Sequence, residues 1–201
     1  MKNILIPTQN EGKHMDIRSE TILNSVAEAE DLYQSVKIKL YDVNNWEMVC
    51  GSSITHFELT LANGAFSDQV KEGNLIKIDV LGPGTIAGKG YDWVHIEKIA
   101  HSGEQELNPW TGFRVRPCAT PREPELGIAH FFDELASSTF MVGRTGRTVW
   151  ASMHGRNEIL NTHAHLLIDR LRNGLVGLAA KIGLSHPQWK LLVKGLVKKQ
   201  A

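Results

Sequence analysis

The chain has 201 residues, a length that suits one domain and lets it bury most of the surface that the unfolded chain exposes. Lys plus Arg and Asp plus Glu number 22 each, so the formal net charge is zero. This balance argues against nucleic acid as a partner, because phosphate contacts need a basic excess. It also leaves a homo-oligomer open, because little charge repulsion keeps copies apart. We expect one α+β domain over residues 1–201, with 183–201 as a C-terminal helical appendage.

The two cysteines, Cys50 and Cys118, are too far apart in sequence for a CxxC pair and too few for a disulfide framework. No stretch approaches the ~20 apolar residues that a membrane-spanning helix needs. No signal-peptide pattern opens the chain. The sequence therefore predicts a cytoplasmic location, no membrane partner and two reduced, buried or half-buried thiols.

The first elements expected are a strand in residues 1–8 and an amphipathic helix that begins at Ser19 as its N-cap. Downstream of Ser19, apolar residues recur at three- and four-residue steps, which aligns them on one stripe of a helix. The helix is expected to end before Tyr41. A turn rich in Asn and Asp follows, and Trp46 at its end packs back onto the core or its rim.

The middle of the chain alternates apolar and polar residues with a period of two, which is typical of half-buried strands. Three such runs lie in residues 55–62, 75–80 and 91–99. The connections between them are too short for the crossover that parallel strands need, so we expect neighbouring antiparallel strands.

The alternation resumes in a short strand around Phe113, which Pro117 stops. Residues 138–156 then have the clearest hairpin pattern in the chain, with the turn sequence GRTGR. A helical repeat follows over residues 163–183, and residues 185–199 form a last helix with lysines on its outer face.

The expected order is therefore strand, helix, about six antiparallel strands, long helix and short helix. That order is similar to the helix-grip fold of the START and polyketide-cyclase-like proteins, in which a curved sheet wraps a C-terminal helix around a cavity. The resemblance covers most of the chain as element order and involves no motif. It implies an α+β fold with a curved antiparallel sheet of six or seven strands, an N-terminal helix and a long C-terminal helix. A small closed β-barrel with added helices is the alternative, since the glycine-rich loop at 82–90 also suits a barrel corner.

That loop, GPGTIAGKG, lacks the features of a nucleotide site. Gly88 and Lys89 are followed by Gly90 where a P-loop has Ser or Thr. No helix follows whose N-terminus would hold a phosphate. A tightly turned strand connection is the better interpretation.

Aromatic residues gather in or beside the predicted strands. If several line one concave face, they form an amphipathic pocket; the alternative is that they are the core. Our leading prediction is a small, partly apolar ligand in a cavity between the sheet and the C-terminal helix. The residues predicted to bind it are Tyr91, Trp93, Trp150 and Arg114.

A second prediction is a metal-dependent hydrolase, with a divalent metal as the one cofactor the sequence indicates. His154, Glu158, His163 and His165 fall within twelve residues, and imidazoles with one carboxylate suit Zn²⁺ with a position left open for water. The spacing matches no zincin motif, and surface histidines are the alternative interpretation.

A third prediction is a protein-interaction module without enzymatic activity. It would present Arg144 and Arg147 at the tip of the predicted hairpin, because arginine is enriched at protein interfaces. The sequence leaves open whether the protein is an enzyme.

Overall fold

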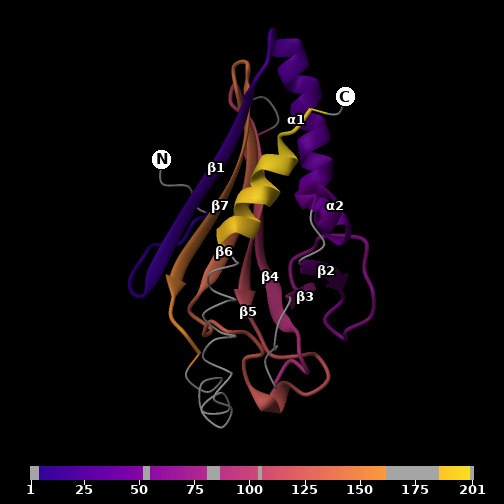
Figure 1. Ribbon diagram of the computed structural model, residues 1–201, viewed down its shortest axis with the longest axis vertical. Coiled ribbons are helices and arrows are strands. Elements are labelled where there is room, and N and C mark those ends of the chain that lie inside the picture. Colours follow the sequence, from indigo (N-terminus) through magenta and orange to yellow (C-terminus); the bar gives the residue numbers. More distant parts are fainter. Residues whose placement is uncertain (1–4, 52–54, 81–86, 104–105, 162–185, 200–201) are drawn as a thin grey trace.

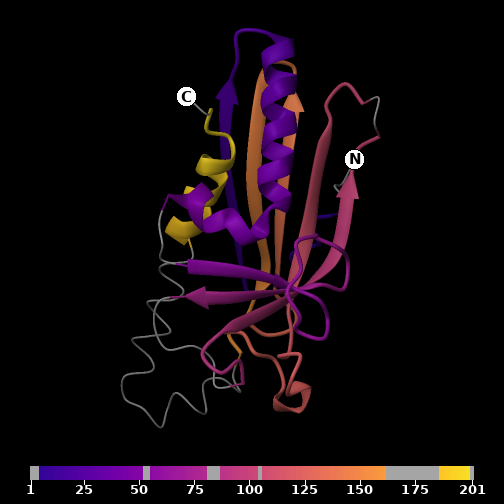
Figure 2. The same ribbon diagram turned by 90° about the vertical axis from the view of Figure 1, so that its right-hand side faces the viewer.

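The computed structural model describes residues 5–51, 55–80, 87–103, 106–161 and 186–199. Its centre is a seven-stranded antiparallel sheet with the order β1-β7-β6-β5-β4-β3-β2. The sheet curls strongly, so that β2 and β3 run across the direction of β1, β6 and β7 (Figures 1 and 2). The strands are β1 (Lys13–Ile22), β2 (Thr55–Thr60), β3 (Leu75–Val80), β4 (Asp92–His101), β5 (Trp110–Pro117), β6 (Ser137–Thr145) and β7 (Thr148–Glu158).

Helices cover the concave face of the sheet. The long helix α1 (Val26–Tyr41) lies along β6 and β7 and is followed by η1 (Val43–Asn45) and α2 (Trp46–Cys50). A short turn of helix, η2 (Pro124–Leu126), lies between β5 and β6. Residues 186–196 are also helical, and we call residues 186–199 the C-terminal segment.

The C-terminal segment lies between α1 and β1 (Figure 1). The Thr21 hydroxyl of β1 donates to the carbonyl of Val197 at 2.8 Å, and Lys39 of α1 donates to the carbonyl of Lys198 at 3.1 Å. Gly195 lets the segment approach α2, because a Cβ at this position would overlap the carbonyl oxygen of Val49. The sheet and α1 thus grip a C-terminal helix, which confirms the helix-grip architecture.

The core fills the space between the concave face and the helices. Trp46 is 1% exposed and contacts Phe57, Phe113 and Phe140, with ring centroids 4.9–5.9 Å apart. These side chains come from α2, β2, β5 and β6. Alternate residues of each strand therefore supply the core, as the period of two predicted.

The N-terminal helix begins later than the sequence predicted. Ser19 lies in β1, and Ser25 is the N-cap, whose hydroxyl accepts the backbone N–H of Glu28 at 3.1 Å. Ile22 fits the predicted helical stripe, but it is the last residue of β1 and is 67% exposed. The pairing of β1 with β7 outweighs the helical spacing there, since the strand pairs without interruption from Met15 to Ile22 and the register shifts only between Lys13 and Met15.

The predicted strand at 1–8 is wrong for its described residues, 5–8, which form a turn and coil. Leu5 is fully buried on the convex face, close to Gly112 and Met141. The N-terminal segment therefore covers the outside of the sheet instead of extending it.

The other strands and the hairpin lie where the sequence predicted them, and the closed barrel is wrong. Among the described residues, β1 and β2 are the two edges of an open sheet. The predicted helix at 163–183 lies outside the described residues, so the single domain over 1–201 stays a prediction. No helix in the described ranges has both the length and the apolar character that crossing a membrane requires.

Candidate ligand-binding pocket

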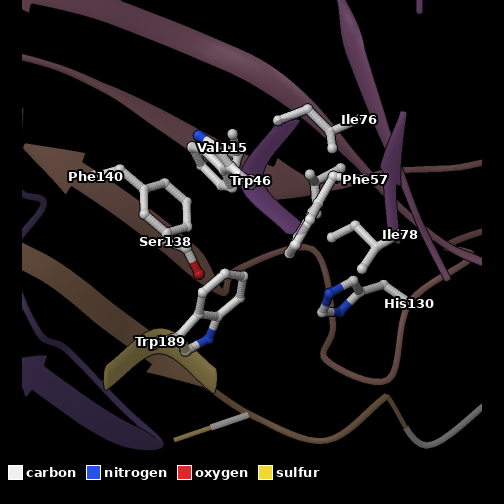
Figure 3. A pocket seen from close by; sticks show the side chains of 10 residues that line it. Trp46, Phe57, Ile76, Ile78, Val115, His130, Ser138, Phe140 and Trp189 are labelled. Carbon is white, nitrogen blue, oxygen red and sulfur yellow. The ribbon is translucent and has the colours of Figure 1, made fainter. Parts of the chain in front are cut away.

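A pocket lies between the concave face of the sheet and the C-terminal segment (Figure 3). Its open volume is about 30 Å³. That is room for roughly two water molecules and far less than the ~300–1,000 Å³ of a typical ligand site. The lining residues are Trp46, Phe57, Ile76, Ile78, Val94, Val115, His130, Ser138, Phe140 and Trp189.

Strand register brings the apolar wall together. Phe57 of β2 is opposite Ile78 of β3, and Ile76 is opposite Val94 of β4. Because side chains on neighbouring strands share a face at paired positions, these residues form one continuous apolar surface.

Trp189 covers the pocket from the side of the C-terminal segment. Its ring meets Phe140 edge-on, with centroids 5.2 Å apart, and lies 6.0 Å from the ring of Phe57. The neighbouring Gln188 accepts a hydrogen bond from the hydroxyl of Thr55 on β2. The indole N–H of Trp189 makes no hydrogen bond within the described part of the chain, where this side chain is held by apolar packing against the core.

Two polar side chains interrupt the apolar wall. Nδ1 of His130 accepts the backbone N–H of Phe132 at 3.0 Å, which places the proton of the neutral ring on Nε2. The hydroxyl of Ser138 points toward the indole of Trp189 (Figure 3). In the ranges that the structure describes, this hydroxyl forms no hydrogen bond, so it can bond a molecule that enters the pocket.

Three of the four predicted ligand residues lie on the opposite, convex face. Trp93 precedes Val94, Arg114 precedes Val115 and Trp150 precedes Ala151, and in each pair the second residue faces the core. Because successive side chains of a strand point to opposite faces, the first of each pair points away from the pocket.

The predicted ligand residues already have partners outside the pocket. The guanidinium of Arg18 stacks over the Trp150 ring at 4.6 Å, and Arg114 forms an ion pair of 2.7 Å with Glu97. Trp93 packs in a small cluster with Leu75 and Ala129. Tyr91, the fourth residue, packs against that cluster under the ammonium of Lys77. None of the four lines the pocket.

The predicted metal ligands are only partly described. Nδ1 of His154 lies 2.5 Å from the Asp16 carboxylate, and its Nε2 lies 3.0 Å from the hydroxyl of Ser152. Within the described ranges, no three His, Cys, Asp or Glu side chains form a group that could hold a metal ion. His163 and His165 lie outside those ranges, so the metal site stays a prediction.

The carboxyl groups near His154 differ in their environments. Burial pushes the pKa of Asp16 up, but hydrogen bonds from His154 and Arg156 outweigh it, and the pKa falls below its ordinary value. Burial raises the pKa of Glu158 despite the attraction of Arg156 and Lys13. Asp16 therefore pairs with His154 and Arg156 of β7. Glu158 is the carboxyl group that is harder to ionise.

The predicted interaction surface at the hairpin tip is engaged within the chain. Arg144 forms an ion pair of 2.8 Å with Glu30 of α1, and its side chain is 12% exposed. Arg147 donates to the carbonyl of Asn24 at 3.3 Å. These two arginines connect the hairpin to the start of α1.

In the glycine-rich loop, Lys89 forms an ion pair of 2.7 Å with Glu123.

Sequence reasoning found the apolar strand residues of this wall as alternating runs but did not assign those residues to a site. The signal was the alternation itself: Phe57, Ile76, Val94, Val115 and Phe140 are the apolar members of alternating runs. Choosing the uninterrupted apolar face of every strand would have identified the pocket wall. The contribution of Trp189 needed the placement of a helix far away in sequence.

Comparisons with known proteins give only weak likenesses. No protein-family model matches the chain, and no curated protein matches it significantly. Among solved structures, the hypothetical protein jhp0584 from Helicobacter pylori is 9% identical, with a TM-score of 0.46 over 91% of this chain and 86% of that chain. Protein Ms6760 from Mycobacterium smegmatis is 12% identical, with a TM-score of 0.41 over 94% and 92%. The major latex-like protein 151 from Panax ginseng is 14% identical, with a TM-score of 0.35 over 87% and 99%.

At these identities and TM-scores the likenesses carry no inference about ligand or activity. The helix-grip architecture rests on the strand order and on the position of the C-terminal segment. The function must be argued from the pocket.

Proposed function

We propose that the protein binds a small, partly apolar molecule in the pocket beneath Trp189. The composition of the wall supports this most directly, because eight apolar side chains surround the space and only His130 and Ser138 interrupt them. An apolar lining with a few placed polar groups is the usual composition of a small-molecule site.

The open volume determines how a ligand enters. About 30 Å³ does not admit a ring, so a ring-sized ligand must displace a wall residue. Trp189 is the wall residue best suited to move, because it is half-buried and, among the described residues, apolar packing with the rings of Phe57 and Phe140 holds it without a hydrogen bond. The segment stays anchored meanwhile by Leu192 and Leu196, which are buried in the core.

The chemistry of the wall limits the class of ligand. The hydroxyl of Ser138 can donate and accept a hydrogen bond. Among the described lining residues there is no Asp, Glu, Lys or Arg that would compensate a buried charge. The ligand is therefore a neutral ring or branched apolar group that carries one hydroxyl, carbonyl or amide.

Phenol and toluene form a matched pair of probes, since they differ by a hydroxyl in place of a methyl group. We expect both to shift the NMR signals of Phe57, Phe140 and Trp189 when titrated into the full chain. Ser138→Ala should weaken phenol binding about 2- to 10-fold, equivalent to the ~0.5–1.5 kcal/mol of a neutral hydrogen bond. Toluene binding should be unchanged.

Ser19→Ala is the control, because Ser19 is a half-buried strand serine in β1 and does not line the pocket. Ser19→Ala should leave the affinities for phenol and for toluene unchanged. Signals that shift only outside the pocket, or an equal loss for both probes in Ser138→Ala, would contradict the proposal.

A further inference from the structure

The strand β1 presents a long open edge of the sheet. It has ten residues and pairs with β7 on one side only, as the first strand in the sheet order. Figure 1 shows β1 at the margin of the molecule, on the side away from α1. Unpaired edges of this kind are templates for pairing with another chain, and natural proteins commonly protect them with charges or bulges.

The backbone groups that face this edge can be identified. The N–H of Leu23 donates to the carbonyl of Arg147 at 2.9 Å, and Ile22 is paired with Thr148. Since the direction of these groups alternates along an antiparallel strand, Ile17 and the other odd-numbered residues point their amides toward β7. The amides of Asp16, Arg18, Glu20 and Ile22 therefore point toward the open edge.

The described residues leave this edge uncovered. No hydrogen bond from the described part of the chain reaches the backbone of Asp16, Arg18 or Glu20 from outside the β1–β7 ladder. The charged side chains beside this edge are accessible: those of Asp16, Arg18 and Glu20 are 49%, 51% and 51% exposed.

The charge order along β1 is complementary to itself in two antiparallel registers. The register centred on Ser19 places Arg18 opposite Glu20 but leaves Asp16 opposite the apolar Ile22, whereas the register centred on Ile17 gives both Asp16 and Glu20 a polar partner. In an antiparallel pair of two β1 strands centred on Ile17, Asp16 is opposite Arg18 of the second copy, and His14 is opposite Glu20. By symmetry each contact occurs twice. Centring the pair on Arg18 instead places Arg18 opposite itself and Asp16 opposite Glu20. Opposite charges at facing positions stabilise a strand pair by about 0.2–1 kcal/mol each, and like charges destabilise it by similar amounts.

The register centred on Ile17 also satisfies the backbone. Asp16 and Arg18 both point their amides outward, so as facing residues they can exchange two N–H···O bonds. We propose that two copies of this chain associate through antiparallel pairing of β1 with β1, centred on Ile17. The two curled sheets then form one continuous sheet.

Charge substitutions test both the interface and its register. Sedimentation velocity of the full chain over a concentration series should show a dimer for the wild type. Arg18→Glu places like charges opposite Asp16 twice, so the dissociation constant should rise at least about ten-fold. Asp16→Lys should do the same. A mixture of the two variants should dimerise again, because every facing pair at these positions is then of opposite charge.

Asp16→Lys also removes the ion pairs with His154 and Arg156, which could disturb the fold. A second variant therefore tests the backbone pairing without changing Asp16. Glu20→Pro removes an outward N–H and leaves the ladder with β7 intact, so it should abolish the dimer. Glu20→Ala keeps that N–H and should weaken the dimer only a few-fold. A monomer at 1 mM, or a dimer indifferent to both Arg18→Glu and Glu20→Pro, would overturn the proposal. So would an assembly that grows beyond the dimer.

Discussion

Trp189 meets the ring of Phe140 edge-on, with centroids 5.2 Å apart and planes at 64°. This contact joins the C-terminal segment to β6 across the pocket. It makes the indole of Trp189 part of the core packing and also the cover of the candidate site. A substitution at Trp189 should therefore affect stability and ligand access in opposite directions.

We expect Trp189→Ala to lower the free energy of unfolding by about 1–3 kcal/mol, less than for a fully buried Trp because the ring is half-buried. The vacated space has the shape of an indole. Free indole should therefore raise the melting temperature of the variant more than that of the wild type, by mass action on the folded state. Trp150→Ala is the control, since Trp150 lies on the convex face under Arg18. Equal stabilisation of both variants by indole would show that the site beneath Trp189 does not bind it.

Ser25→Ala should destabilise the protein by about 1 kcal/mol. The hydroxyl of Ser25 accepts the N–H of Glu28 at the start of α1, and losing an N-cap typically has this effect. Ser19→Ala should cost less than about 0.5 kcal/mol, because Ser19 lies in β1 and caps no helix. Chemical denaturation of both variants measures the difference. A larger loss in Ser19→Ala would place the helix start where the sequence pattern first suggested it.

Gly195→Ala should destabilise the protein by about 1–3 kcal/mol, although alanine favours a helix by about 1 kcal/mol over glycine. The new Cβ would overlap the carbonyl oxygen of Val49 in α2, and this clash outweighs the gain in helix propensity. Gly103→Ala should be nearly neutral, since its Cβ would make only an ordinary contact with Glu106. Thermal unfolding distinguishes the two. A stabilised Gly195→Ala variant would mean that the segment does not press against α2.

Asp16→Asn should remove stability at neutral pH and have little effect in acid. The folded-state pKa of Asp16 lies below the ordinary value of 3.8 because His154 and Arg156 bond to the carboxylate. Its contribution is therefore full above pH 3.8 and is lost as the pH falls through the lower, folded-state pKa.

Since Asp16 is half-exposed, solvent screening keeps the loss at pH 7 below about 1 kcal/mol. Urea unfolding from pH 7 to pH 3 should show the wild type and the Asn variant converging in acid. Glu20→Gln, on the same face of β1, provides the comparison. A difference that persists unchanged at pH 3 would assign the effect of Asp16→Asn to packing rather than charge.

The sequence predicted most of the fold because strand periodicity is local. Apolar residues recur at every second position around Phe57, Ile76 and Val94, and each run became a strand with these residues in the core. The start of α1 was missed because Ile22 fits a helical stripe as well as a strand. The pairing with β7 that decides between them joins residues more than a hundred positions apart.

The site was harder to predict, for a physical reason. Trp93 and Val94 are adjacent and both suit a strand. The alternation with Ile96 assigns Val94 to the apolar face, but only the curvature of the whole sheet brings such faces together around a pocket. A large aromatic side chain suggests a binding site, whereas Val94 is the residue of this pair that lines the proposed pocket. The partners that cover Trp150 and Arg114 come from β1 and β4, so no local pattern could show that these residues were already occupied.

The hydrogen bond between Thr21 and Val197 spans 176 positions of the chain. Closing so long a loop carries a large entropic cost, and contacts of this kind slow folding. Until the C-terminal segment docks, the aromatic surface formed by Trp46, Phe57 and Phe140 lacks its cover. Refolding from denaturant should therefore pass through a compact species that binds a hydrophobic dye, and docking of the last helix should release the dye.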